Sequence, residues 1–213
     1  MAMRDSVALA APTVDDAKAI AEIISHSFWP KYIRFGFKST EAATRLSEAE
    51  YRKNATLLPE RFRVAKVDGR VVGAIKITLH GDKQRWQPLT EAEAEPFVTA
   101  LTRRRAWKLE KISDYECAKR EAYVAMVGVH ESMRGRGVGK LLMQWADDAA
   151  IANGASTIAL HVSTSNAAVR LYKREGYKIV GRETSRCLCC CMRRWFGVPG
   201  FFLMRKKLPR GTD

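Results

Sequence analysis

The sequence predicts an α/β protein in which a mixed, mostly antiparallel sheet of about seven strands is covered by about four helices and an inserted helical segment. Two observations predict this class. Residues 62–79 contain two β-branched runs around Asp68-Gly69, the pattern of a type I′ hairpin. Further along, apolar runs typical of buried strands alternate with helical runs, which indicates parallel strands joined by crossovers.

The first part of the chain is predicted to form a strand, two helices and the hairpin. The strand is the run "VALAAP", and Thr13 is the expected N-cap of the helix that follows, with two aspartates in its first turn. The second helix is the run "STEAATRLSEAEYRKNATLL", which we expect to begin at Ser39 or Thr40 and to stop near Pro59.

The second part begins with residues 81–120, which we interpret as an insertion that is largely helical by composition. A strand "AYVAMVGV", a helix "KLLMQWADDAAIANG", a strand "TIALHV" and a helix "NAAVRLYKREG" follow in order, and each helix closes at a glycine. The last two strands are "YKIVGRETS" and "GFFLMRKKL". Because no repeat or linker divides the chain, we expect one domain over residues 1–213.

The stretch "VGVHESMRGRGVGKLL" places three alternate glycines between a strand and a helix. Glycine weakens both kinds of element, so these residues should serve a need of the backbone. Unpaired N–H groups and the positive end of the dipole make the start of a helix an anion site, which glycines allow a phosphate to approach closely. We expect a ligand with several phosphates to contact the following loop residues: Arg134, Gly135, Arg136, Gly137, Val138, Gly139 and Lys140.

Two common phosphate-binding motifs do not fit this loop. A Walker A motif requires a hydroxyl residue after its lysine, whereas Leu141 follows Lys140. A dinucleotide-binding motif requires two residues between its second and third glycines, whereas a single residue separates Gly137 from Gly139.

The chain is strongly basic, with 37 lysines and arginines against 23 aspartates and glutamates and a formal net charge of +14. Such a charge attracts nucleic acid, acidic membrane surfaces or phosphorylated ligands, and the alternative is a solubilising surface. The run "TRRRAWK" with Trp107 is suited to phosphate contacts and base stacking, or to covering the sheet with a charged helix face. The sequence does not exclude nucleic acid as a partner, but we do not favour it. No apolar run reaches the roughly 18 residues of a membrane span.

Four of the five cysteines lie in "CLCCC". Disulfide scaffolds of secreted proteins have spread, even-numbered cysteines, and the N-terminus lacks a signal-peptide pattern, so we expect reduced thiols and a cytoplasmic protein. Neighbouring cysteines on a strand point to opposite faces and no spaced second pair is present, so we expect no bound metal. Two interpretations of the cluster remain: free thiols in an edge strand and loop, and a loop that is lipidated or touches a membrane.

Two motifs resemble those of the GNAT superfamily of N-acetyltransferases. The run Arg134-Gly-Arg-Gly137-Val-Gly139 is similar to its Arg/Gln-x-x-Gly-x-Gly/Ala signature. The run "NAAVRLYKREGYKIVG" is similar to its second motif at the following residues: Asn166, Leu171, Tyr172, Gly176 and Tyr177. The order of elements also agrees. The chain departs from the family at Glu131, where proline is common, and in the length of the 81–120 insertion.

The resemblance implies how the parts work together. Two parallel strands would splay apart and admit acetyl-CoA, the expected co-substrate. The backbone of Val127 and Val129 would pair with the pantetheine arm like an added strand. The glycine loop would hold the pyrophosphate, and Asn166 would reach the pantetheine from the next helix.

Acetyl transfer needs a neutral amine, a stabilised charge on the acetyl oxygen and a proton for the departing thiolate. The resemblance places Tyr172 near the sulfur as the proton donor, with a packing role as the alternative. It also makes the backbone N–H of Val129 the expected donor to the oxygen.

Several groups are candidates for the base. Alternation along the strand predicts that Tyr123 and Val127 share one face, with Glu121 at its start. Glu121 is a weak candidate that would act through water, and a solvated charge at the strand end is the alternative. His130 and His161 have side chains suited to proton transfer near neutral pH. Family members also work with ordered water and no protein base.

The sequence therefore predicts an acetyl-CoA-dependent N-acetyltransferase that moves an acetyl group to a primary amine by direct attack in a ternary complex. The acceptor is expected to be a small molecule or a peptide, and a homodimer stays open. Two alternatives remain: a catalytically silent CoA-binding regulatory module, and a nucleic-acid-binding protein that uses the basic surface.

Overall fold

The computed structural model describes the chain in several stretches: residues 6–28, 37, 39–54, 59–82, 87, 89–94, 96–97, 99, 115–183 and 200–209. The cluster "CLCCC", Trp107 and most of the predicted 81–120 insertion lie outside these residues. Within the insertion, the described part contains the short helix α4 (Glu91–Ala94).

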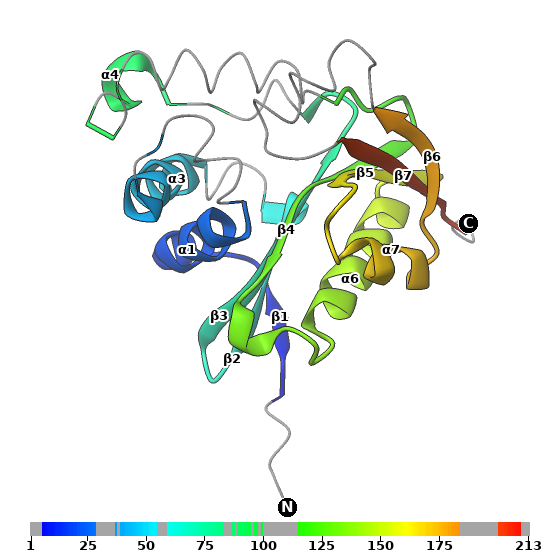
Figure 1. The fold of residues 1–213 in the computed structure, drawn as a ribbon, viewed down its shortest axis with the longest axis horizontal. Helices are drawn as coiled ribbons and strands as arrows, with labels where there is room; N and C mark the ends of the chain where they lie inside the picture. The colour runs from blue at the N-terminus through cyan, green and yellow to red at the C-terminus, as the bar shows by residue number, and fades with distance from the viewer. Residues whose placement is uncertain are drawn as a thin grey trace, which may run out of the picture.

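The described residues form one seven-stranded sheet in the order β1-β2-β3-β4-β5-β7-β6 (Figure 1). Its strands are β1 (Ala8–Ala10), β2 (Phe62–Val67), β3 (Arg70–Leu79), β4 (Glu121–Val129), β5 (Thr157–Ser163), β6 (Lys178–Glu183) and β7 (Phe201–Lys207). Within the described sheet, β4 and β5 pair in parallel and all other neighbours are antiparallel. The predicted mixed and mostly antiparallel sheet is thus confirmed.

In the second half of the chain, strands joined by a helix are not always neighbours in the sheet. The strands β5 and β6, which α7 connects, do not pair with each other, because β7 lies between them and is antiparallel to both. Two strands antiparallel to the same neighbour point the same way, so the crossover brings the chain back in the expected direction one strand further out.

Local signals in the sequence fix the turn and the helix ends. Asp68 and Gly69 have φ angles of 48° and 76°, and positive φ at both central residues defines the predicted type I′ turn. The Ser39 hydroxyl accepts from the Ala42 N–H at 3.2 Å and begins α3. At the end of α6, Gly154 has φ of 74°, the left-handed conformation expected for a C-cap.

Helices cover both faces of the sheet. Their bounds are η1 (Val14–Asp16), α1 (Ala17–Ser27), α3 (Thr40–Asn54), η2 (Pro59–Arg61), η4 (Glu131–Met133), α6 (Val138–Ala152) and α7 (Val169–Arg174). Figure 1 shows α1 and α3 on one face, with α6 and α7 on the other. The sheet therefore presents two different surfaces, and the face on which a strand residue lies decides which helices it contacts.

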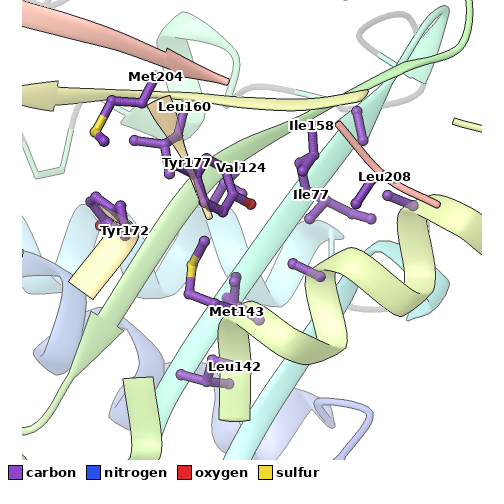
Figure 2. Packing of buried hydrophobic residues seen from close by; sticks show 14 of the residues in the cluster. Ile77, Val124, Leu142, Met143, Ile158, Leu160, Tyr172, Tyr177, Met204 and Leu208 are labelled. Carbon is purple, nitrogen blue, oxygen red and sulfur yellow. The ribbon is translucent and has the colours of Figure 1, made fainter. Parts of the chain in front are cut away.

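The main hydrophobic core lies between α6, α7 and the sheet (Figure 2). Its larger members include Ile77, Val124, Leu142, Met143, Ile158, Leu160, Tyr172, Tyr177, Met204 and Leu208. A smaller cluster on the opposite face joins Ile20 and Ile24 of α1 to Val64, Ala74 and Met126 of the sheet. Both faces of β4 are thus packed against helices, which holds this strand firmly between them.

Candidate functional site

The parallel strands β4 and β5 pair over a short distance and then part. The ladder joins residues 121–123 of β4 to residues 157–159 of β5 and goes no further, although β4 continues to Val129 and β5 to Ser163. The two strands therefore leave backbone edges that face one another without pairing. This is the predicted splayed parallel pair.

The backbone of Val129 and Val127 points into this divergence. The His130 N–H donates to the Val72 carbonyl at 2.8 Å across the β3–β4 ladder. Opposed residues of an antiparallel pair alternate between hydrogen-bonded and non-hydrogen-bonded positions. Val129 and, two residues earlier, Val127 are therefore in non-hydrogen-bonded positions, and their N–H and C=O groups face away from β3 towards the β5 side.

A β-bulge at Ala125 overturns the predicted alternation along β4. The register with β3 skips Ala125, so one extra residue is inserted into β4 and the faces exchange at this point. Val127, predicted on the face of Tyr123, instead packs with Val124 on the α6 side. A bulge of this kind depends on the partner strand, which is why the alternation of β4 alone gave the wrong face.

The three glycines between β4 and α6 meet two different needs. Gly135 and Gly137 have φ angles of 76° and 89°, a region that other residues rarely adopt. A Cβ atom on either would meet nothing within 4 Å, so the space beside them is open. Gly139 is needed for packing instead, because its Cβ would lie 3.1 Å from the Cδ2 atom of Leu171 in α7.

The loop has the character of an anion site. Among the described residues, we find no acceptor for the backbone N–H groups of residues 135–140 at the start of α6. Arg134, Arg136 and Lys140 are exposed around them. The Arg134 Nε donates to the Val129 carbonyl at 3.1 Å, which ties this side chain to the end of β4. Free amides, a helix dipole and three cations thus converge beside the diverging strands.

Tyr172 lies on α7 in the main core, which it shares with residues of α6, and the residue is 7% exposed. Its ring centroid is 6.2 Å from that of Tyr177. Burial raises the pKa of Tyr172 to about 12. The hydroxyl is therefore protonated throughout the neutral range, which is the state that a proton donor requires.

Asn166 lies in the turn between β5 and α7. Its backbone N–H donates to the Ser163 carbonyl at 3.0 Å, and its side-chain oxygen accepts from the Ala168 N–H at 2.8 Å. The side chain therefore helps to begin α7, and it is exposed at the end of β5 where the strands have parted.

Glu121 is occupied by other protein groups. Its side chain is 6% exposed, and its Oε1 accepts from the Arg205 Nε at 2.8 Å. Its Oε2 accepts from the Tyr115 hydroxyl at 2.8 Å and from the Ala118 N–H at 3.3 Å. A carboxylate held in this way ties β4 to β7 and to the preceding segment. This geometry disfavours both a role as base and the alternative of a solvated strand-end charge.

The two candidate histidines have different surroundings. His130 is exposed at the start of η4, with its Nδ1 2.8 Å from the Ser132 hydroxyl. His161 lies on β5, and its Nδ1 is 3.1 Å from the Tyr123 hydroxyl on β4. The sequence did not predict this pair, because the contact depends on the register between two strands that are 38 residues apart.

In the part of the chain that the structure describes, no group of three or more histidine, cysteine, aspartate or glutamate side chains is placed to bind a metal ion. Within those same stretches, no helix combines the length and the apolarity needed to cross a membrane.

Comparison with known proteins identifies the family of this chain. A family model described as "Acetyltransferase (GNAT) family" matches residues 22–177. The "Uncharacterized N-acetyltransferase YdgE" of Bacillus subtilis (strain 168) is 36% identical over 72 residues, which cover 33% of this chain and 46% of that protein. The matched stretch thus spans less than half of this relative.

Solved structures with the same fold include Ard1 from Thermoplasma volcanium, with a TM-score of 0.58 and 17% identity over 96% of this chain and 99% of that one. The PaiA N-acetyltransferase from Thermoplasma acidophilum, in complex with coenzyme A, has a TM-score of 0.57 and 15% identity over 95% of this chain and 99% of that one. The family model covers well over half of the sequence, so the chain belongs to the acetyltransferase (GNAT) family.

Proposed function

We propose that this chain transfers an acetyl group from acetyl-CoA to a primary amine of a small molecule or a peptide, by direct attack in a ternary complex. The observation that carries the proposal is the loop of left-handed glycines at the start of α6, which stands beside the diverging edges of β4 and β5. Such an arrangement combines an anion site with free strand edges, and CoA carries both phosphates and an amide-containing arm.

Separate parts of the candidate site suit separate parts of the CoA molecule. The open space at Gly135 and Gly137 and the free amides of the loop suit a pyrophosphate. The outward-facing backbone of Val127 and Val129 suits the amides of the pantetheine arm, which would add to β4 like a strand. Asn166 is exposed and follows shortly after the end of β5, the strand that provides the second free edge. Acetyl-CoA would supply an activated acyl group that needs no covalent attachment to the protein.

The chain's own groups would then act on the acetyl unit. The Val129 N–H, which faces the divergence, would donate to the acetyl oxygen as negative charge develops there. Tyr172, which is protonated at neutral pH, would give its proton to the departing thiolate, and the proton that the nitrogen loses as the amide forms would return to Tyr172 through solvent. We do not retain Glu121 as a base, because three donors already hold its carboxylate.

Two measurements test this function. Calorimetry with acetyl-CoA measures binding, and a thiol-detecting assay measures CoA release with a panel of alkylamines, amino acids and short peptides. We expect acetyl-CoA to bind and CoA release to depend on the amine. Binding without release for every amine would favour a silent CoA-binding module. Retention on heparin that persists in saturating CoA would favour a nucleic-acid-binding protein.

A further inference from the structure

A cavity of about 170 Å³ lies between the end of β3 and the segment that precedes β4. Thr78 of β3 and His80, which follows this strand, line one side of the cavity. Tyr115, Glu116 and Cys117 line the other side. A cavity of about 150 Å³ can hold a benzene molecule, so this one has room for a group of about six non-hydrogen atoms. None of these residues takes part in the acetyl transfer proposed above.

Hydrogen bonds fix both sides of the cavity. The Cys117 Sγ donates to the Thr78 carbonyl at 3.5 Å, and the His80 Nδ1 is 2.9 Å from the Cys117 carbonyl. The Tyr115 hydroxyl donates to the Glu121 Oε2 on β4 at 2.8 Å. The segment before β4 is thus tied to β3 and to β4. Because the cavity is already formed, little loss of freedom in the protein opposes the binding of a ligand there.

The cavity offers mainly hydrogen-bond acceptors. A carbonyl oxygen can only accept, so the contact with Cys117 places the His80 proton on Nδ1 and leaves the Nε2 of the neutral ring as an acceptor. Among the described residues, no hydrogen bond or ion pair engages the Glu116 carboxylate. The Tyr115 ring adds a π face, which attracts cations. No lysine or arginine is present among the described residues of the lining, which therefore suits a cation and disfavours an anion.

Size and charge indicate which cation fits. Over the stretches that the structure describes, no group of three or more histidine, cysteine, aspartate or glutamate side chains is placed to bind a metal ion. The net charge of +14 repels cations on average, so a bound cation needs a local site of acceptors such as this one. An ammonium group on a short alkyl chain fits both the volume and the acceptors of the cavity.

The cavity lies next to the point where β4 and β5 part. Thr78 is opposite Tyr123 in the β3–β4 ladder, and opposed residues of an antiparallel pair have Cα atoms about 5 Å apart. The Tyr115 ring stacks on Tyr123 with centroids 4.5 Å apart. The parallel ladder between β4 and β5 ends at Tyr123. A ligand that extends from the diverging strands past Tyr115 therefore reaches the cavity.

We propose that this cavity binds a second ammonium group of the acceptor, one that is separate from the nitrogen that is acetylated; the inference rests on the proposed acetyl transfer. The Glu116 carboxylate neutralises the bound charge, and the His80 Nε2 accepts from its N–H groups. The alkylammonium group comes from a linear diamine or from the lysine side chain of a peptide. The cavity takes no part in the chemical step, and it selects the acceptor by its charge.

The test measures thiol release with matched pairs of acceptors that differ by one charge. Each linear diamine with four to ten carbons is compared with the monoamine in which a methyl group replaces the second ammonium group, such as pentylamine for 1,4-diaminobutane. Tripeptides with lysine or norleucine at the second position form the pair for a peptide source. We expect the charged member of at least one pair to have a kcat/KM at least about 10-fold higher, the usual effect of a hydrogen bond to a charged group. The pair with the larger ratio identifies the source.

The variant Glu116→Gln shows whether the preference comes from this cavity. It keeps the size of the side chain and removes its charge, so the ratio of kcat/KM between the charged and the uncharged acceptor should fall about 10-fold. Glu22→Gln is the matched control, because it removes an exposed carboxylate on α1 and should keep the wild-type ratio. Calorimetry with acetyl-CoA checks that each variant still binds the co-substrate.

The outcomes separate this inference from the proposed function. If the wild type releases no thiol with any amine, the proposed function fails and the inference with it. If the wild type is active but the two members of every pair react alike, the inference alone is overturned. A wild-type ratio in Glu116→Gln would place the second ammonium group outside this cavity and would also overturn it.

Discussion

Tyr172 is the residue on which the release of the thiol depends in the proposed chemistry. Its hydroxyl matters when the thiolate departs, so Tyr172→Phe should lower kcat and leave the Kd of acetyl-CoA nearly unchanged. General acids typically contribute about 10²- to 10⁴-fold. Phenylalanine keeps the ring in the core. Steady-state kinetics with calorimetry separates the two effects, and equal turnover in both proteins would leave solvent as the proton source.

The burial of Tyr172 also predicts how stability depends on alkaline pH. Its pKa is about 12 in the folded protein against a reference of 10.0, so the unfolded chain releases this proton first as pH rises. The contribution of Tyr172 to the free energy of unfolding is therefore fully present below pH 10. It is lost between about pH 10 and 12, and the loss is roughly 3 kcal/mol for two pKa units. Urea unfolding across this pH range should show that the free energy of unfolding falls less steeply with pH for Tyr172→Phe than for the wild type.

The comparison of Tyr172→Phe with the wild type requires the same urea unfolding series for a variant of Tyr177. Burial and the neighbouring Asp147 carboxylate raise the pKa of Tyr177 as well, so it contributes to the loss in the same direction. Tyr177→Phe is therefore the matched variant for this part of the alkaline transition. An identical pH dependence in Tyr172→Phe and the wild type would contradict the role of Tyr172 burial.

The loop before α6 is the element that defines the anion site. Gly137→Asp should reduce acetyl-CoA affinity at least 10-fold, because it brings a negative charge and a side chain to the free amides. Gly154→Asp is the control at the other end of α6, since Gly154 also has positive φ and open space around it. Circular dichroism checks folding, and calorimetry measures the affinity. Wild-type affinity in a folded Gly137→Asp protein would place the phosphates elsewhere.

At the scale of the whole sheet, local signals could be predicted from the sequence and long-range register could not. The Asp68-Gly69 turn, the Ser39 cap and the glycine loop each depend on a few consecutive residues, and each was predicted. The bulge at Ala125, the Glu121–Arg205 pair and the Tyr123–His161 contact depend on how distant strands align. A single-residue shift exchanges the faces of a strand, so alternation alone could not place Val127 correctly.

The net charge of +14 predicts that the whole molecule attracts the phosphates of its proposed substrate. Arg134, Arg136 and Lys140 are exposed at the loop, where salt screens their interactions within a Debye length of about 10 Å at 0.1 M. Raising the salt from about 0.05 to 0.5 M should weaken acetyl-CoA binding by roughly 10-fold. Acetyl-pantetheine, which lacks the phosphates, should bind weakly at both salt concentrations. Equal salt dependence for the two ligands, measured by calorimetry, would show that the basic surface serves another partner.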